Sequence, residues 1–316
     1  MSGPDLLVVG DCNPDVLVLG QDVTPAFGQQ EKLVDGIWLV IGGSAAITAV
    51  AAARLGLSVA LVAAVGADPA GTFMLDQLAR EGVDVSAVAI RPGVPTGMTV
   101  ALSRGGDRAI LTALGAMASL TAADVPVALL AQCRHVHVSS YFLLADTLGP
   151  GLAGILSAAR QAGATTSLDT NWDPSGRWGD SSLAAAIAQT DVLVPNEAEA
   201  LALSAATSLD VATGTLAAGR SLVVKLGERG ALCADGQLRQ RVSLPLVTPV
   251  DATGAGDCFN AGLIAGLLGG LALAEATALG CAAGALSTGA PGGTASAPGM
   301  AAAARLASRA SVRPAG

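Results

Sequence analysis

DATGAGDCFNAGLIAGLLG, residues 251–269, is the stretch from which the rest of the chain can be interpreted. Asp251 and Asp257 flank a turn of small residues, and an unbroken apolar run follows that predicts a buried helix. A turn this poor in side chains lets backbone N–H groups converge at the helix N-terminus, where the helix dipole favours an anion. The stretch therefore predicts a phosphate-binding turn.

Asp257 lies at the start of the helix, next to the predicted anion site, where a negatively charged side chain would repel the anion. The simplest explanation for a carboxylate at this position is general base catalysis, in which Asp257 takes a proton from a hydroxyl. The N–H groups of Gly254, Ala255 and Gly256 would stabilise the charge on a phosphoryl group in transfer. The structural alternative is a helix N-cap, because Asp favours that position.

Composition excludes several classes of protein. Of 316 residues, 52% are hydrophobic and 13% charged, which indicates a globular chain long enough for a sizeable core. A formal charge of −8 without any run of Lys or Arg argues against nucleic acid or anionic membrane as a partner. We therefore expect any bound anion to be held locally.

The chain also lacks signals for secretion, membrane insertion or a disulfide framework. The N-terminus has no basic segment followed by an apolar run, so we expect a cytoplasmic protein. The apolar stretch 261–274 is shorter than the ~20 residues of a membrane span. Five scattered cysteines and the pair His135 and His137 match no disulfide or zinc pattern.

After Leu120 the pattern alternates regularly between short apolar runs and helical stretches. The predicted strands are RHVHVSS, ATTSLDT, DVLVPN and SLVVKLG. Such alternation predicts an α/β fold with a doubly wound, mostly parallel sheet and helices on both faces. Every one of these strands ends in polar residues, which is where open sheets of this kind bind ligands.

Two motifs far apart in the chain resemble one family. GGSAAITAVAAARLG, residues 42–56, with the sequence that follows it, closely resembles the N-terminal signature of the ribokinase (PfkB-type) carbohydrate kinases, and DATGAGDCFNAG resembles their C-terminal signature. NEAE, residues 196–199, and KLG, residues 225–227, lie between them in the family's order. The resemblance implies a single ribokinase-like domain, 1–316, that uses ATP and Mg²⁺ to phosphorylate a small sugar.

The resemblance also implies a substrate side to the site. An N-x-D at the place of Asn13 and Asp15 holds sugar hydroxyls in the family, and Gly42 and Gly43 would bring the backbone close to the sugar. The alternative for Asn13 and Asp15 is turn chemistry. Arg108 is a candidate for binding an acidic or phosphorylated substrate, with a solvated surface arginine as the alternative.

The nucleotide side follows in the same way. Asn196 and Glu199 would organise Mg²⁺ through water, a role that suits oxygen ligands, although the same spacing fits a helix capping box. Lys225 and Gly227 belong to the family's nucleotide loop, where a lysine could reach a phosphate. The remaining residues are assigned from the family: Thr288 and Gly256 to the nucleotide, Asp251 and Thr253 to a monovalent cation such as K⁺, and Asp169 and Asn171 to a place near the phosphate.

Two segments stand outside the alternation of strands and helices. Residues of about 12–40 and 94–114 contain alternating runs, the second with a hairpin signal at Arg104-Gly105-Gly106-Asp107. They resemble the small β-sheet lid that covers the substrate in this family and often mediates dimer contacts. We therefore expect an inserted lid and a homodimer formed through it.

The sequence departs from the family at two positions. Ile47 occupies a place usually filled by a sugar-binding Asn, and Cys281 a place where ribokinases often have Asn near the adenine. A nucleoside kinase of the same fold is therefore an alternative, because Ile47, Phe27 and Trp38 would suit a flat base. A non-catalytic sugar sensor is a second alternative, which the intact GAGD motif disfavours. A dinucleotide-dependent dehydrogenase is a third, weakened because no G-x-G-x-x-G follows the first strand.

Overall fold

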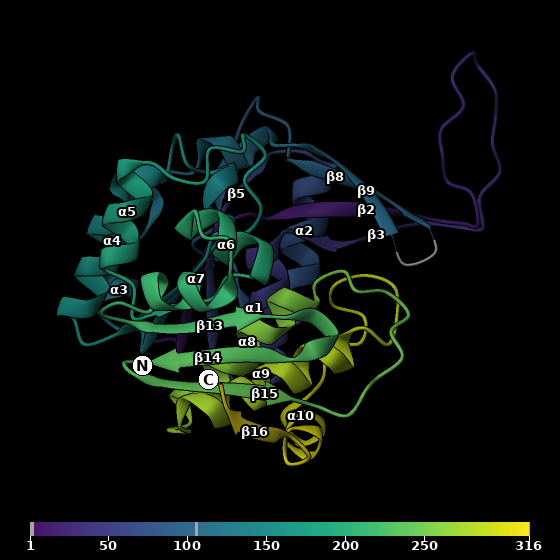
Figure 1. Cartoon of the computed structure of the whole chain (residues 1–316). Coiled ribbons are helices and arrows are strands. Elements are labelled where there is room, and N and C mark those ends of the chain that lie inside the picture. The colour runs from purple at the N-terminus through teal and green to yellow at the C-terminus, as the bar shows by residue number, and fades with distance from the viewer. Residues whose placement is uncertain (1–2, 105–106, 316) are drawn as a thin grey trace.

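The fold is dominated by one large twisted sheet (Figure 1). A computed structural model describes residues 3–104 and 107–315, with side chains for all of these except residues 104, 107 and 108. In this part of the chain ten strands form the large sheet in the order β16-β15-β14-β13-β12-β11-β10-β1-β4-β6. Their bounds are β1 Leu6–Val9, β4 Val59–Val62, β6 Val83–Asp84, β10 His135–Ser139, β11 Thr165–Asp169, β12 Val192–Leu193, β13 Ser221–Lys225, β14 Ala231–Asp235, β15 Leu238–Ser243 and β16 Ser311–Pro314.

The strands from β13 to β6 run parallel, and β14, β15 and β16 add antiparallel neighbours at one edge. Apolar side chains on the two faces of the sheet form separate clusters, which explains the helices on both sides. The helices are α1 Ser44–Arg54, α2 Pro69–Arg80, α3 Val127–Leu130, α4 Gly149–Gln161, α5 Ser181–Ala188, α6 Glu197–Ser204, α7 Leu209–Leu216, α8 Ala255–Leu268, α9 Leu273–Ser287 and α10 Met300–Ala307. The predicted doubly wound, mostly parallel α/β fold is confirmed.

Helices α1, α2, α8, α9 and α10 pack on one face, and α4, α5, α6 and α7 on the other. The apolar run after Asp257 forms α8, whose residues from Asp257 to Gly266 are all buried. Helix α2 begins with an N-cap, because Asp68 accepts a hydrogen bond from the Gly71 N–H and Pro69 follows it at the first helical position. No helix in the described ranges is both long and apolar enough to cross a membrane.

A separate four-stranded sheet has the order β3-β2-β8-β9 and projects from the body (Figure 1). Its strands are β2 Asn13–Leu19, β3 Gly36–Gly42, β8 Met98–Arg104 and β9 Asp107–Ala113, and a further small pair is β5 Ala64–Gly66 with β7 Ala89–Arg91. The four strands come from the two segments expected to form the lid. The chain between β2 and β3 extends as an arm away from the rest of the molecule (Figure 1).

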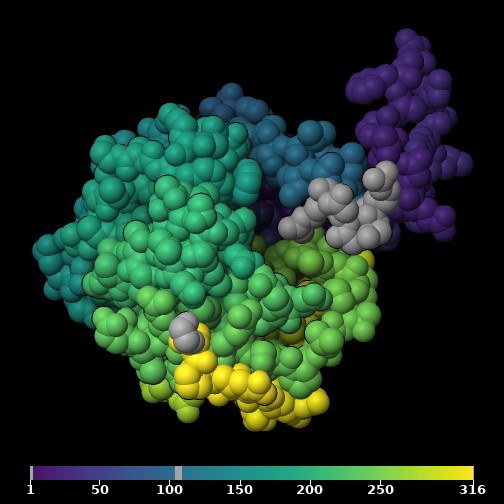
Figure 2. Space-filling view, viewed as in Figure 1, coloured from purple at the N-terminus to yellow at the C-terminus, as the bar shows by residue number. Residues whose placement is uncertain are grey.

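Strand register shows which lid residues face the body. Asp15 pairs with Thr99, and Leu17 with Trp38, so these residues share one face of the lid. A side chain added at Gly292, in the loop after α9, would touch Leu17 and Val40, so this face looks toward the body. The space-filling view shows a hollow between the lid strands and the two halves of the body (Figure 2).

Candidate active site

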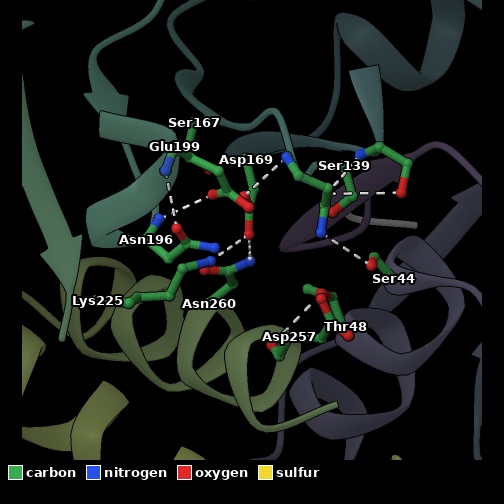
Figure 3. A network of polar contacts seen from close by, with 12 residues as sticks. Ser44, Thr48, Ser139, Ser167, Asp169, Asn196, Glu199, Lys225, Asp257 and Asn260 are labelled. Atoms are coloured by element: carbon green, nitrogen blue, oxygen red, sulfur yellow. Dashed lines mark hydrogen bonds and ion pairs between the residues drawn. The ribbon is translucent and has the colours of Figure 1, made fainter. Parts of the chain in front are cut away.

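The candidate active site lies at the carboxyl ends of the parallel strands. The chain runs from β1 to β4 on one side, while β10 lies on the other side of β1. This is a topological switch point, where open α/β sheets bind ligands. Asp11 follows β1, Ser139 ends β10 and is followed by Ser140, and Asp169 ends β11. Figure 3 shows Ser139 and Asp169 near the N-terminal part of α8, which carries Asp257 and Asn260.

Asp257 lies in the first turn of α8 and is only 8% exposed. Burial raises its pKa well above the usual value for Asp, and the nearby charges of Asp169 and Asp11 add to the rise. The positive charge of Lys225 opposes it. A carboxyl group whose pKa is raised in this way is a better proton acceptor than an ordinary Asp.

The turn before α8 depends on Gly254. This N-cap residue has φ +71°, a left-handed conformation that favours glycine. A Cβ atom at Gly254 would lie 2.6 Å from Gly293 Cα and 3.0 Å from Ile47 Cγ2. Both the backbone conformation and the packing therefore require glycine at this position.

The open end of α8 presents backbone donors to the crevice. Ala255 N–H is used internally, because it donates to Ala252 O at 3.2 Å. Within the described residues, the N–H groups of Gly254, Gly256 and Asp257 have no hydrogen-bond acceptor. The free donors at this helix N-terminus are thus those of Gly254, Gly256 and Asp257, and they suit an anion.

The N-terminus of α1 meets that of α8, since Thr48 Oγ1 donates to Asp257 O at 3.4 Å. Asp11 already occupies the α1 end, where Ser44 N–H and Ala45 N–H each donate to its carboxylate at 2.9 Å. Two positive helix ends therefore point to one crevice, and one of them is neutralised by the protein itself. The α8 end is the one left for a ligand.

Asp169 is the centre of a polar network beside this helix end (Figure 3). Its carboxylate pairs with Lys225 Nζ and accepts a hydrogen bond from Asn260 Nδ2 at 2.6 Å. A Cβ atom at Gly256 would lie 3.5 Å from Lys225 Nζ, so the ammonium group sits against the turn. Burial lowers the pKa of Lys225, but Asp169 and Glu199 raise it to a net upward shift. The lysine therefore remains charged.

Asn171 extends the network toward α1. It accepts a hydrogen bond from Ser140 N–H at 2.7 Å and donates from Nδ2 to Ser44 Oγ at 3.1 Å. The D-x-N pair Asp169 and Asn171 thereby joins β10, β11, β13, α1 and α8 around the crevice. In the structure Asn171 contacts Ser44 at the start of α1 and Asp169 contacts Asn260 in α8, and their place near a phosphate stays a prediction.

Asn196 and Glu199 form the capping box at the start of α6. Asn196 N–H donates to Glu199 Oε2 at 2.8 Å, and Glu199 N–H donates to Asn196 Oδ1 at 2.9 Å. Glu199 is buried, and burial together with the charge of Asp169 raises its pKa to about 7. Two neighbouring buried carboxylates that repel each other are a donor set that fits a hard divalent cation. No cluster of three or more His, Cys, Asp or Glu side chains forms a metal site by itself in the described ranges.

A cavity of about 270 Å³ opens on the other side of the turn. Four residues assigned to the nucleotide line it: Lys225, Gly227, Gly256 and Thr288. Asn196 is not part of its lining. The remaining wall is mostly apolar and includes Phe259, Cys281, Leu244, Leu246 and Val247. Such a wall suits a flat, partly apolar group, with the polar end of the cavity at the α8 turn.

The substrate residues of the lid meet at its hinge. Asn13 Nδ2 donates to Asp15 Oδ1 at 3.0 Å and to Thr99 Oγ1 at 3.1 Å. A Cβ atom at Gly42 would overlap the Asp15 carboxylate at 1.9 Å, and one at Gly43 would lie 2.9 Å from Asp11 O. Both glycines thus allow the lid strand to pass close to these side chains. Arg108 lies on β9, but its side chain is outside the described structure.

Asp251 ties the turn to the loop that follows α9. Its Oδ1 accepts hydrogen bonds from Thr253 N–H at 2.9 Å and from Thr253 Oγ1 at 2.7 Å, and its Oδ2 accepts from Gly292 N–H at 2.8 Å. Thr288 O accepts from Val250 N–H and Asp251 N–H at 2.8 and 3.1 Å. The two residues assigned to a monovalent cation therefore also hold the turn in place.

Several residues of the site were not singled out from the sequence. Asn260 lies three residues after Asp257, a helical spacing that places both on one face of α8, so a signal for it existed. Thr99 and Thr112 share a hydrogen bond of 3.1 Å that continues the Asn13 contact across the lid. No sequence pattern indicated that Asp11 caps α1.

Comparison with known proteins agrees with this site. The family model described as pfkB family carbohydrate kinase matches residues 4–300. A fructokinase of Salmonella typhimurium is 31% identical over 81% of this chain and 85% of its own. A 2-dehydro-3-deoxygluconokinase of Bacillus subtilis is 32% identical over 80% of this chain and 82% of its own.

A solved structure shares the fold. The fructokinase of Vibrio cholerae O395, in its form with fructose, ADP and calcium bound, superposes with a TM-score of 0.77 at 26% identity, covering 95% of this chain and 98% of its own. The family match spans nearly all of the chain and includes both glycine-led motifs. The chain therefore belongs to the pfkB family of carbohydrate kinases and is a phosphotransferase with an alcohol group of a sugar as acceptor.

Proposed function

We propose that the protein is an ATP-dependent kinase of a small sugar or sugar acid, with Asp257 as the general base and the turn before α8 as the anion hole. The observation that carries this proposal is the position of Asp257, a buried carboxyl group with a raised pKa beside free backbone donors. The base and the donors lie in one helical turn. A hydroxyl placed at Asp257 would therefore already face the phosphoryl group it attacks.

The donors of the anion hole would stabilise charge on the transferring phosphoryl group. The N–H groups of Gly254, Gly256 and Asp257 are rigidly held by the start of α8, so they would not need to reorganise during the reaction. Lys225 adds a full positive charge from the nucleotide side, where its Nζ lies against Gly256. Asp169 acts as a positioning residue because it pairs with Lys225, and Asn260 in turn donates to Asp169.

Magnesium would be held beside the buried carboxylates Glu199 and Asp169. When bound, it neutralises charge on the nucleotide phosphates, a role that hard oxygen ligands and bound water permit. The structure of the Vibrio cholerae fructokinase, which has fructose, ADP and calcium bound, supports a nucleotide and a divalent cation at this site. A monovalent cation such as K⁺ at Asp251 and Thr253 remains part of the proposal.

The substrate would bind between the hinge of the lid and Asp257. Asn13, Asp15, Thr99 and Thr112 form a connected row of hydroxyl-binding groups on the face of the lid that looks toward the body. Such a row suits a molecule with several hydroxyl groups. The names of the relatives, fructokinase and 2-dehydro-3-deoxygluconokinase, support sugars and sugar acids as the substrates to examine first.

The nucleoside alternative has less support. Ile47 is 3% exposed and packs against Gly254 and Gly293. Its side chain is therefore buried against the turn before α8 and is not accessible to a nucleobase. Trp38 folds over Gly36, on the lid beyond the polar hinge. Phe27 is 95% exposed on the arm. The three apolar residues that suggested a nucleoside are thus not gathered at Asp257.

We also propose a homodimer formed through the lid. The face of the lid turned away from the body carries an apolar row, Leu39, Val16, Val100 and Leu111, one residue from each strand. Leu39 and Leu111 are 48% and 65% exposed. An exposed apolar surface of this kind marks an interaction site, and the same face of a second copy would cover it.

The experiment is a screen for substrate-dependent release of ADP. The purified protein is incubated with ATP and Mg²⁺ and with fructose, ribose, 2-dehydro-3-deoxygluconate or adenosine, and ADP is measured with a coupled assay. We expect at least one sugar or sugar acid to give turnover and the Asp257→Asn variant to give almost none. Turnover with adenosine alone would replace the proposal by the nucleoside alternative.

A further inference from the structure

A second cavity lies outside the active site, at the edge of the large sheet. It has a volume of about 430 Å³, within the range of roughly 300–1,000 Å³ that is usual for ligand pockets. Its lining comes from the N-terminus of α7, from β14 and β15, and from β16 with the residue after it: Leu209, Asp210, Leu232, Arg241, Ser243, Arg313, Pro314 and Ala315. Strands β15 and β16 lie side by side at this edge (Figure 1).

Two arginines of the lining face each other directly. Arg241 on β15 is the register partner of Arg313 on β16. Side chains paired in this way stand about 5 Å apart at their Cβ atoms, and like charges there are destabilising. Within the described residues the side chain of Arg241 makes no hydrogen bond or ion pair, and the side chain of Arg313 donates only to Ser311 Oγ at 3.2 Å. Neither guanidinium group is therefore paired with a carboxylate, and Arg241 is half-buried while Arg313 is exposed.

A common explanation for such charges covers only Arg313, which is exposed on the edge strand β16. Charged side chains on an edge strand can prevent sheets from associating edge to edge. Arg241, however, lies on β15, which is inside the sheet and not at its edge. Both arginines also point to the face that α7 partly covers, because Arg241 pairs with Leu232, a residue of the core beneath α7. The charges are thus directed into the cavity.

Further groups of the lining suit the same ligand. The N–H groups of Leu209 and Asp210, at the start of α7, have no acceptor within the described residues. They add donors and a positive helix end to the two guanidinium groups. Leu209, Leu232 and Pro314 provide an apolar wall next to these donors. Asp210 is the one carboxylate in the lining, and it forms no ion pair among the described residues.

We propose that this cavity binds a small phosphate monoester, with its phosphate between Arg241 and Arg313 and its organic part against the apolar wall. A phosphate offers three acceptor oxygens and close to two negative charges, which matches two guanidinium groups and two free N–H groups. The site is separate from the active site. Ser243 lines this cavity, and the next residue, Leu244, lines the nucleotide cavity. Because neighbouring side chains along an extended chain point to opposite sides, the two cavities lie on opposite faces of the sheet.

The test measures binding of glycerol 3-phosphate and of inorganic phosphate by calorimetry at low ionic strength. We compare the full-length protein with Arg241→Gln, Arg313→Gln and Asp210→Asn, and with Arg305→Gln on α10 as a control for lost surface charge. The background from the active site is the same in all of them. We expect each arginine variant to weaken this binding event at least about tenfold, Asp210→Asn to strengthen it, and Arg305→Gln to leave it unchanged.

Two outcomes would overturn the proposal. One is unchanged binding in both arginine variants when thermal melts show them to be folded. The other is equal affinity for inorganic phosphate and glycerol 3-phosphate, since the apolar wall would then have no role. Crystals soaked in tungstate add a direct readout. We expect a heavy-atom peak between the two guanidinium groups, and a peak only at the N-terminus of α8 would contradict the assignment.

Discussion

Asp257 combines two properties that a single carboxylate rarely has. It is buried, which disfavours its charge, yet it lies beside donors that favour negative charge. The net result is a pKa raised well above the usual value for Asp, so the group exchanges its proton in a pH range where an ordinary Asp stays ionised. A raised pKa makes Asp257 a stronger proton acceptor for a substrate hydroxyl than an ordinary Asp would be.

We expect Asp257→Asn to lower kcat by about 10²–10⁴-fold, the usual scale for a lost general base. In the wild type, kcat/KM should fall as the pH drops through the raised pKa, because protonated Asp257 cannot accept a proton. A pH–rate profile and a urea titration check this. Because the pKa of Asp257 is raised in the folded protein, its contribution to the free energy of unfolding decreases as the pH rises through that pKa, and this decrease should be absent in the variant. Near-normal turnover in the variant would remove Asp257 from the role of base.

Glu199 poses a related question, because its capping contact and its proposed magnesium role can be separated. Glu199→Gln removes the charge but keeps a side chain that can complete a capping box. We expect the Mg²⁺ concentration needed for half-maximal activity to rise about tenfold or more, while the protein stays folded. A magnesium titration of activity measures this. An unchanged requirement for Mg²⁺ would leave Glu199 with the capping role alone.

The pH dependence of stability gives a second readout for Glu199. Burial and Asp169 raise its pKa from 4.5 to about 7, so the folded protein binds this proton more tightly than the unfolded chain. The contribution of Glu199 to the free energy of unfolding therefore decreases as the pH rises from 4.5 to 7. The decrease should be absent in Glu199→Gln, and melting temperatures measured across this range would show it.

At the scale of the element, α8 is both the centre of the core and the wall of the catalytic crevice. Its residues from Asp257 to Gly266 are buried against α1 and α9, so its N-terminus cannot move without the core. The two glycines at its start, Gly254 and Gly256, are needed for different reasons. Gly254 is needed for its backbone conformation, whereas Gly256 is helical and only its missing side chain matters.

We expect Gly256→Ala to stabilise the fold slightly and to impair catalysis. Alanine is better than glycine in a helix by roughly 0.5–1 kcal/mol. The added Cβ, however, would lie 3.5 Å from Lys225 Nζ, in the lining of the nucleotide cavity. The KM for ATP should therefore rise several-fold while the urea midpoint does not fall.

Gly154→Ala on α4 is the matched control for this change, because a Cβ there meets nothing within 4 Å. It should give a similar gain in stability and normal kinetics. If Gly256→Ala had the same kinetics as Gly154→Ala, the turn would not hold the phosphates.

The sequence predicts an element well when the residues that determine it are neighbours in the chain, and poorly when they are far apart in the chain. The turn before α8 could be predicted because its glycines and Asp257 are neighbours in the chain. The Asp169 network could not, because Lys225 and Asn260 reach it through strand order and helix packing over 56 and 91 residues. His135 and His137 illustrate the same limit. Their spacing matches no zinc pattern, but it does not reveal that both are fully buried and share the hydroxyl of Ser167 on the next strand.

At the scale of the whole molecule, the lid has two faces with different chemistry. The face toward the body carries Asp15, Thr99 and Thr112, which suit a hydroxylated substrate. The face away from it carries the apolar row of Leu39, Val16, Val100 and Leu111. Side chains alternate along a strand, so one lid sheet can bind substrate on one side and a second copy on the other. Dimerisation would then hold the lid in a defined shape.

We expect the double variant Leu39→Lys, Leu111→Lys to be monomeric, because four lysines would be buried where the two lids meet. Sedimentation velocity measures the change, and Ile90→Lys, at a residue of β7 that is 53% exposed, controls for the added charge. The monomer should keep its fold but bind its sugar more weakly, since an isolated lid is held only by its hinge. A wild type that sediments as a monomer would end the dimer proposal. A double variant that stays dimeric would place the interface on another surface.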